Sequence, residues 1–88
     1  MTMDEIIYKN FSKRFYDKLK NTVNASVRCT VDENEDKLNI EFNRLGIQYK
    51  TSVKNLSEVI KSGEAEAEIE FDKVIKRYKT FIHHKFFF

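Results

Sequence analysis

The sequence predicts a single α+β domain spanning residues 1–88, with elements in the order helix, three strands, helix, helix. Near both ends of the chain, apolar residues recur every three or four positions, which is the period of a helix with one buried face. Between residues 25 and 53 they recur every second position, which is the period of a half-buried strand. Short polar segments divide that region into three. We therefore expect a three-stranded antiparallel meander packed against two long helices.

Length and composition limit the function classes. A chain of 88 residues is too short to divide into several domains, and with two Gly and no Pro it should contain few loops. The single Cys excludes an intrachain disulfide and fits a reducing, cytoplasmic location. No segment has the apolar length of a membrane span or a secretory signal. The net charge of +2 is too small to indicate a nucleic-acid partner by itself.

The first helix is expected over roughly residues 3–22. Thr2 and Glu5 have the spacing of a capping box, in which a hydroxyl and a carboxylate each accept an N–H from the first turn. The predicted apolar stripe is Tyr8, Phe11, Phe15, Leu19 and Val23, with Ile7 beside it.

The three strands follow from the period of two. Asn43 to Gly46 predicts a tight connection between the second and third strands, with Gly46 at the position that needs a positive φ. Residues 33–36 form a polar, acidic turn between the first two strands. The predicted inward residues are Val27, Cys29 and Val31, then Leu38, Ile40 and Phe42, then Ile47, Tyr49, Thr51 and Val53.

A short second helix is predicted after the sheet. Asn55 and Glu58 repeat the capping-box spacing, and Gly63 stands where a left-handed C-cap would end the helix. Leu56, Val59 and Ile60 would supply its apolar face.

The third helix is predicted from residue 65 to about residue 85. Five acids lie between Glu64 and Asp72, and five bases without an acid follow, which complements the helix dipole. Residues 65–71 also alternate between apolar residues and glutamate, so a strand is the competing interpretation there; the Ala and Glu content favours a helix. The expected stripe is Ala67, Phe71, Val74, Tyr78, Phe81 and Lys85, widened by Ile75, Ile82 and Phe86.

No residue pattern predicts a catalytic, metal or cofactor site. Cys29 lies in mid-strand on the inward side, where a thiol is structural and lacks the access that a nucleophile needs. His83 and His84 are neighbours and point about 100° apart on a helix, so they do not form the i, i+4 pair that chelates a metal. The Glu64–Asp72 acids scatter around the helix as a solvated first turn. We therefore expect a non-catalytic protein without a small-molecule substrate.

The aromatic C-terminus predicts a protein-binding surface. Three consecutive Phe residues cannot all face one side of a helix, so at least one is exposed unless the end of the chain folds back or meets a partner. The alternative is a frayed chain end. A protein partner or a second copy of the chain, giving a homodimer, would contact Tyr78, Phe81, Ile82, Phe86, Phe87 and Phe88. The tail is too weak a membrane anchor for a membrane role.

Basic residues on the two long helices define an alternative function, weak nucleic-acid binding. An ordinary solvated face is the simpler interpretation of such bases. The candidate phosphate-contacting residues are Lys9, Lys13 and Lys20 on the first helix, with Arg14 beside them, and Lys73, Lys76, Arg77 and Lys79 on the third.

The chain resembles two groups of known proteins. The element order is similar to that of a double-stranded-RNA-binding domain, but Glu64 to Glu68 replace the bases of that family's last helix and would repel phosphate. The pattern from Asn55 to Ile60, then Gly63, then Asp72 to Lys79 resembles small orphan proteins of temperate phages of low-GC Gram-positive bacteria. That resemblance implies an origin in a phage or mobile element. Some such phage proteins are anti-CRISPR inhibitors that imitate DNA with an acidic surface, a pattern from which the +2 charge departs.

Overall fold

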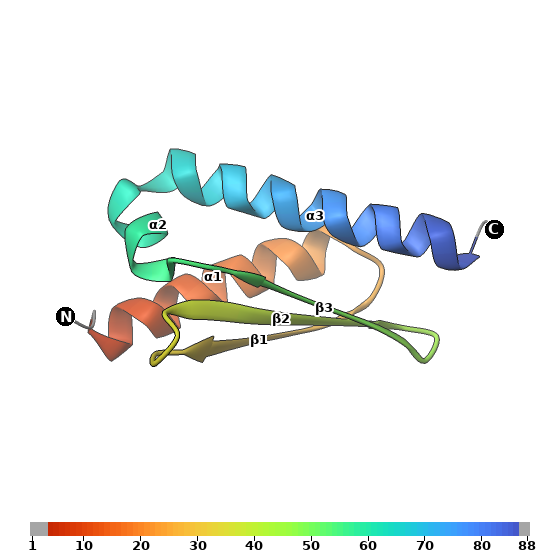
Figure 1. Ribbon diagram of the computed structural model, residues 1–88, viewed down its shortest axis with the longest axis horizontal. Coiled ribbons are helices and arrows are strands. Elements are labelled where there is room, and N and C mark those ends of the chain that lie inside the picture. Colours follow the sequence, from red (N-terminus) through yellow and green to blue (C-terminus); the bar gives the residue numbers. More distant parts are fainter. Residues whose placement is uncertain (1–3, 87–88) are drawn as a thin grey trace.

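A computed structural model describes residues 4–86 and confirms the predicted α+β fold. The two long helices lie on one face of a three-stranded sheet (Figure 1). The molecule is elongated, 44 Å along its longest axis, because α3 and the β2–β3 hairpin run beside each other. The elements are α1 (Glu5–Thr22), β1 (Ser26–Asp32), β2 (Lys37–Arg44), β3 (Ile47–Val53), α2 (Leu56–Ser62) and α3 (Glu64–Phe86).

The sheet is an antiparallel meander of order β1-β2-β3. Val27 pairs with Phe42, and Phe42 pairs with Tyr49, so the inward residues of the three strands form continuous apolar rows. The opposite face is polar. There Glu41 on the central strand lies 3.8 Å from Arg28 and 3.7 Å from Lys50, in two exposed ion pairs. This contrast leaves a single face for the helices to cover.

Helix α1 begins two residues later than predicted, and its cap is a different residue. Asp4 is the N-cap, and its carboxylate accepts a hydrogen bond from Ile6 N–H at 2.8 Å. Glu5, the expected partner in a capping box, forms an ion pair with Lys9 at 3.2 Å. Thr2, the predicted cap, lies outside the described residues. The predicted stripe is confirmed for Tyr8, Phe11, Phe15 and Leu19, which are buried. Val23, which follows the helix as its C-cap, is only half-buried, and Ile7 is exposed.

The predicted tight connection between β2 and β3 is confirmed, and it is a two-residue turn at Leu45 and Gly46. Gly46 has the expected positive φ of 82°, but Leu45 also has a positive φ, of 54°. Gly46 N–H donates to the Asn43 side chain at 3.3 Å, which closes the turn. Positive φ at both central positions matches the twist of a tight hairpin, although leucine is an unfavourable residue there.

Helix α2 is capped by a residue from elsewhere in the chain. Asn55 has a left-handed conformation and makes no side-chain cap hydrogen bond, so the predicted capping box is wrong. Asp36, in the β1–β2 turn, replaces it. Its carboxylate accepts hydrogen bonds from Ser57 N–H at 3.0 Å and Ser57 Oγ at 2.7 Å, and its backbone carbonyl accepts one from Leu56 N–H at 2.8 Å. Tyr8 Oη donates a further hydrogen bond to the same carboxylate at 2.8 Å.

Gly63 joins α2 to α3 in a backbone conformation that only glycine adopts readily. Its φ of 94° is positive as predicted, but its ψ of −167° lies outside the left-handed helical region, so it is not the left-handed cap that was expected. The segment after it is helical from Glu64, and the competing strand interpretation is therefore wrong. Arg14 and Lys18 of α1 form ion pairs with Glu64 and Glu68 across the seam between the two long helices.

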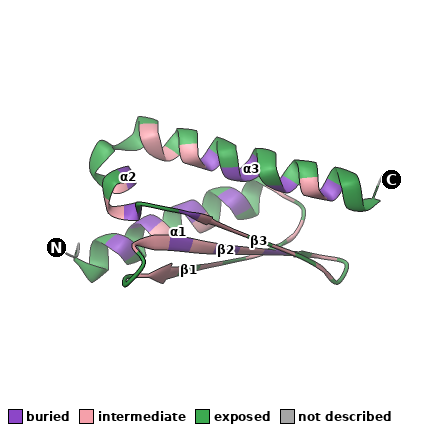
Figure 2. Cartoon of the chain, viewed as in Figure 1, coloured by how far each residue is buried: buried purple, intermediate pink, exposed green. Residues whose placement is uncertain are grey.

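One apolar core joins all the elements. Phe15 and Phe71 meet edge-to-face with ring centroids 5.6 Å apart, which links α1 to α3. Buried residues lie on the inner sides of the three helices and of β2, together with Val53 of β3, while the inward residues of β1 are half-buried (Figure 2). The core comprises Tyr8, Phe11, Phe15, Leu19, Leu38, Ile40, Phe42, Val53, Leu56, Val59, Phe71, Val74, Ile75, Tyr78 and Ile82.

Candidate functional site

The last two turns of α3 lie over the β2–β3 hairpin, at the end of the molecule where the C-terminus emerges (Figure 1). Tyr78 stacks on Phe42 with ring centroids 4.3 Å apart. Tyr78 is 5% exposed and Ile82 is 7% exposed, so these two predicted binding residues belong to the core. They support the surface from beneath.

Beyond these core residues lies a set of partly covered aromatic side chains. Phe81 packs against Tyr49, with ring centroids 4.7 Å apart, and both are half-buried. Phe86 is 37% exposed, and the Arg44 guanidinium lies 5.2 Å from its ring centroid. Leu45, at the tip of the hairpin, is 83% exposed. We call Arg44, Leu45, Tyr49, Phe81, Lys85 and Phe86 the distal patch.

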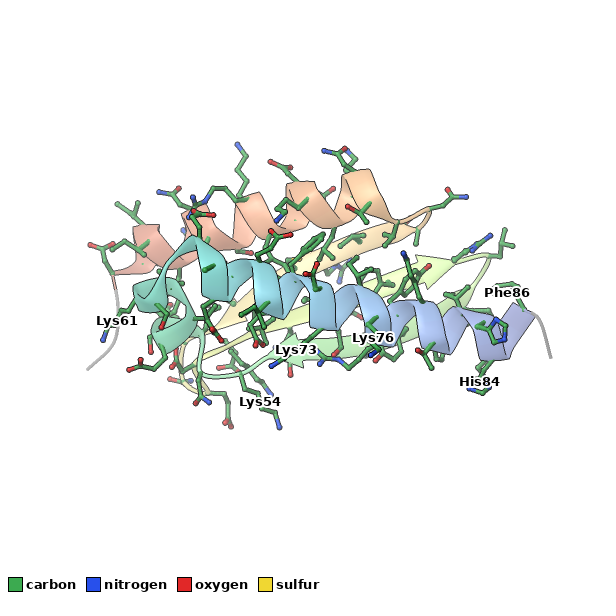
Figure 3. The ribbon with its side chains drawn as sticks, turned by 90° about the horizontal axis from the view of Figure 1, so that it is seen from above. Lys54, Lys61, Lys73, Lys76, His84 and Phe86 are labelled. Carbon is green, nitrogen blue, oxygen red and sulfur yellow. The ribbon has the colours of Figure 1, made fainter. Side chains whose placement is uncertain are left out.

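The charged members of the distal patch are both cations. Lys85 Nζ lies 5.7 Å from the Phe81 ring centroid, so each cation covers part of one aromatic ring. Phe86 and His84 project on opposite sides of α3 (Figure 3).

Beneath the distal patch, the Tyr78 hydroxyl is buried and has no hydrogen-bond partner of normal geometry among the described residues. Burial raises the pKa of Tyr78 above its usual 10.0, while the positive charge of Arg44 and a weak side-chain hydrogen bond with it, too distorted to count as one of normal geometry, act in the opposite direction. A neutral hydroxyl at this depth adds a desolvation cost to an otherwise apolar contact.

The other C-terminal residues considered from the sequence do not provide a set of metal ligands within residues 4–86. Phe87 and Phe88 lie outside the described residues. The His83 and His84 rings are 6.2 Å apart and both side chains are exposed. Within residues 4–86, no group of three or more His, Cys, Asp and Glu side chains is placed to hold a metal ion.

Cys29 lies on the inward side of β1 and is half-buried. Burial raises the pKa of its thiol to about 12, so the thiol is protonated at neutral pH and is a poor nucleophile. Both its position and its protonation state fit the structural role expected from the sequence.

The structure places the predicted nucleic-acid-binding residues on separate parts of the surface. Lys9 and Lys13 line a groove beside β1, whereas Lys73 and Arg77 line one beside β3, at the other edge of the sheet. Lys73 and Lys76 lie along α3 on its β3 side (Figure 3). Lys20 and Lys79 are exposed on α1 and α3.

Several of these bases also have partners within the protein. Lys9 and Lys73 form ion pairs with Glu5 and Glu70, each at 3.2 Å. Arg77 donates hydrogen bonds to Thr51 Oγ1 at 3.1 Å and to the Ser52 carbonyl at 3.3 Å. The predicted bases therefore do not form one phosphate-binding ridge.

Sequence reasoning missed the hairpin half of the distal patch. The sequence indicates only strand and turn positions for Arg44, Leu45 and Tyr49, because which side chains meet α3 depends on tertiary packing. One signal was available: Leu45 is a large apolar residue in a tight turn, where polar residues and glycine normally occur.

Comparisons with protein-family models, curated proteins and solved structures give no significant match. Within residues 4–86, no helix combines the length and apolar character required to cross a bilayer.

Proposed function

We propose that this chain is a non-catalytic protein-binding module that acts through the distal patch. The observation that supports this proposal is the exposure of Phe86 and Leu45 at one end of the molecule, where Phe81 and Tyr49 are only half-buried. Exposed aromatic and aliphatic side chains that adjoin one another commonly mark an interface. Aromatic residues and arginine are also the side chains most enriched at the centres of protein interfaces.

The side chains of the distal patch indicate which chemical groups a partner would present to it. An apolar pocket would cover the Phe86 ring and the Leu45 side chain, and carboxylates around that pocket would pair with Arg44 and Lys85. A second copy of the chain would instead place two basic patches against each other, so a different protein with an acidic rim fits better than a homodimer.

Two single substitutions test this proposal. Phe86→Ser removes the exposed ring at the end of α3, and Leu45→Asn removes the apolar tip of the hairpin without disturbing buried residues. The partner is captured by affinity from a lysate of the source cells, and its dissociation constant is then measured. Phe86→Ser should raise that dissociation constant at least about tenfold. Light scattering of the same variants detects any homodimer.

Ile69→Ser is the matched control, because Ile69 is an exposed apolar residue of α3 far from the hairpin tip. It should leave binding unchanged. Equal loss of binding in the control, or a partner that binds Phe86→Ser and Leu45→Asn as tightly as the unmodified chain, would rule out the distal patch.

The cytoplasmic location and the phage or mobile-element origin are proposals that rest on the sequence patterns alone. Weak nucleic-acid binding is the alternative function, and its test is a shift of DNA or RNA at low salt whose affinity falls linearly with salt on logarithmic axes.

A further inference from the structure

The two edges of the sheet differ in how they are covered. On β3, Arg77 donates hydrogen bonds to the Thr51 hydroxyl and the Ser52 carbonyl, so α3 occupies part of that edge. On β1, no side chain among residues 4–86 donates to or accepts from the outer backbone groups of Ser26–Val31. A row of unpaired backbone groups along a strand without Pro or Gly is a template for another strand.

The widths of the helices and strands leave room for that strand. Each helix is about 10 Å across with its side chains, so two helices cover about 20 Å of sheet. Three strands spaced about 4.8 Å apart cover only about 14 Å. The two long helices lie side by side over the same face of the sheet (Figure 3). Side by side, the two helices are therefore wider than the three strands by about the width of one strand.

A groove lies beside β1, at the edge of the sheet where a fourth strand would pair. It has a volume of about 430 Å³ and runs between α1 and β1. Ser12, Lys13 and Tyr16 line it from the helix, and Cys29, Thr30 and Val31 line it from the strand. Arg14 and Lys18 project from the other side of α1 toward α3, so α1 separates this groove from the seam between the long helices.

We propose that this groove binds an extended peptide of a partner protein, which pairs with β1 as a fourth strand beneath the side of α1. Main-chain hydrogen bonds to β1 supply affinity, and pockets for alternate side chains supply specificity. The inward side chains of the peptide are apolar, because they would contact Tyr16 and the half-buried Val31. The site is separate from the distal patch and does not depend on the function proposed for it.

Charge adds a preference for an acidic residue. Glu5 and Lys9 neutralise each other at 3.2 Å, whereas Lys13 forms no ion pair within the described part of the chain. An acidic side chain near Lys13 is therefore favoured, and Glu33 at the end of the groove disfavours a second one there.

A second copy of the chain is a poorer occupant of this edge. A continuous six-stranded sheet would span about 29 Å, while its four long helices would need about 40 Å. The helices of the two copies would collide above the joined strands. A lone strand carries no helix and avoids this conflict.

The probe for the experiment is a library of random heptapeptides displayed on an unrelated carrier and selected against the full chain. Enriched peptides should lack Pro, alternate apolar with polar residues and carry an acidic residue. A selected peptide added to isotopically labelled protein should shift the amide resonances of Ser26–Asp32 and slow their hydrogen exchange at least about tenfold.

Lys13→Glu should weaken the selected peptide about fivefold. Lys79→Glu is the control, because it makes the same charge change at an exposed site on α3. Tyr16→Ala should weaken binding further, and unchanged strand resonances would show that its fold is intact. Failure to select a binder, shifts confined to the distal patch, or a dimer that forms through β1 would each overturn the proposal.

Discussion

Asp36 joins three elements that are distant in the sequence. Its carboxylate caps α2 through Ser57 and accepts a hydrogen bond from Tyr8, a buried residue of α1. Asp36 itself has a positive φ of 52° in the β1–β2 turn, a conformation that Asp tolerates better than most residues. One side chain therefore fixes the turn, α2 and α1 relative to one another.

We expect Asp36→Ala to lower the free energy of unfolding by about 2 kcal/mol, because it removes hydrogen bonds to a charged acceptor and leaves the first turn of α2 uncapped. Chemical denaturation followed by circular dichroism measures this loss. Asp72→Asn on α3 is the control, since Asp72 is exposed, and its effect should be within about 0.5 kcal/mol. A loss in Asp36→Ala no larger than in the control would contradict the assigned role.

The same residue makes stability depend on pH. Partial burial would raise the pKa of Asp36, but the hydrogen bonds from Ser57 and Tyr8 and the charge of Lys61 outweigh it, so the pKa lies below the usual 3.8. A lowered carboxyl pKa contributes stability that is complete above the usual value and is lost as the pH falls through the folded value. The difference between the unmodified chain and Asp36→Ala should therefore be constant near neutrality and shrink below pH 3.8. A difference that grows in acid would contradict this assignment.

Substitution of Tyr78 is expected to stabilise the fold, in contrast to substitution of Asp36. Its ring stacks on Phe42, but its buried hydroxyl has no hydrogen-bond partner of normal geometry within residues 4–86. Tyr78→Phe keeps the ring and removes the unpaired hydroxyl, so we expect it to stabilise the fold by about 1 kcal/mol. Thermal denaturation measures the change. Destabilisation would mean that the hydroxyl has a favourable partner, and Arg44, whose charge and side-chain hydrogen bond lower the pKa of Tyr78, is the candidate.

At the scale of elements, the β2–β3 hairpin combines poor turn chemistry with an exposed apolar tip. Leu45 has a positive φ of 54°, which costs a residue with a Cβ about 1–2 kcal/mol and costs Asn less. Leu45→Asn should therefore stabilise the hairpin, raising the free energy of unfolding by up to about 1 kcal/mol, measured by denaturation. The same change should weaken binding to the partner of the distal patch. A variant that is more stable but binds normally would separate Leu45 from the proposed interface.

The elements themselves were predictable because their periods differ. Alternation placed the third strand at its observed residues, and the Ala and Glu content of residues 65–70 correctly favoured a helix over a strand. The buried stripe of α1 also followed from spacing alone.

The caps were not predictable from local spacing. Asn55 and Glu58 have the right separation for a capping box, yet the cap of α2 comes from Asp36, which precedes it by a whole hairpin. A side chain brought close by tertiary folding leaves no periodic signal. The distal patch was also not predictable from local spacing, because Arg44 and Tyr49 meet the end of α3 only after the hairpin has packed against it.

At the scale of the molecule, one core runs without interruption from α1 across the sheet to α2 and α3. Phe71 lies where α1 and α3 meet: its ring contacts Phe15 of α1, and Lys18 Nζ lies 4.4 Å from the centroid of the same ring. The exposed ion pairs along this seam contribute little on their own, because exposed pairs are typically worth less than about 1 kcal/mol. Aromatic packing therefore dominates the contact between the two long helices.

Phe71→Ala should lower the free energy of unfolding by about 3–5 kcal/mol, a large share of the roughly 5–15 kcal/mol available to a small domain. Because the core is continuous, helix and sheet should be lost together, so denaturation followed by far-ultraviolet circular dichroism and by tyrosine fluorescence should give one coincident transition. Ile69→Ala, at a 48% exposed position two residues away, should change stability by less than about 0.5 kcal/mol. A sheet that remains folded after α1 and α3 have melted in Phe71→Ala would show that the helices and the strands have separate sources of stability.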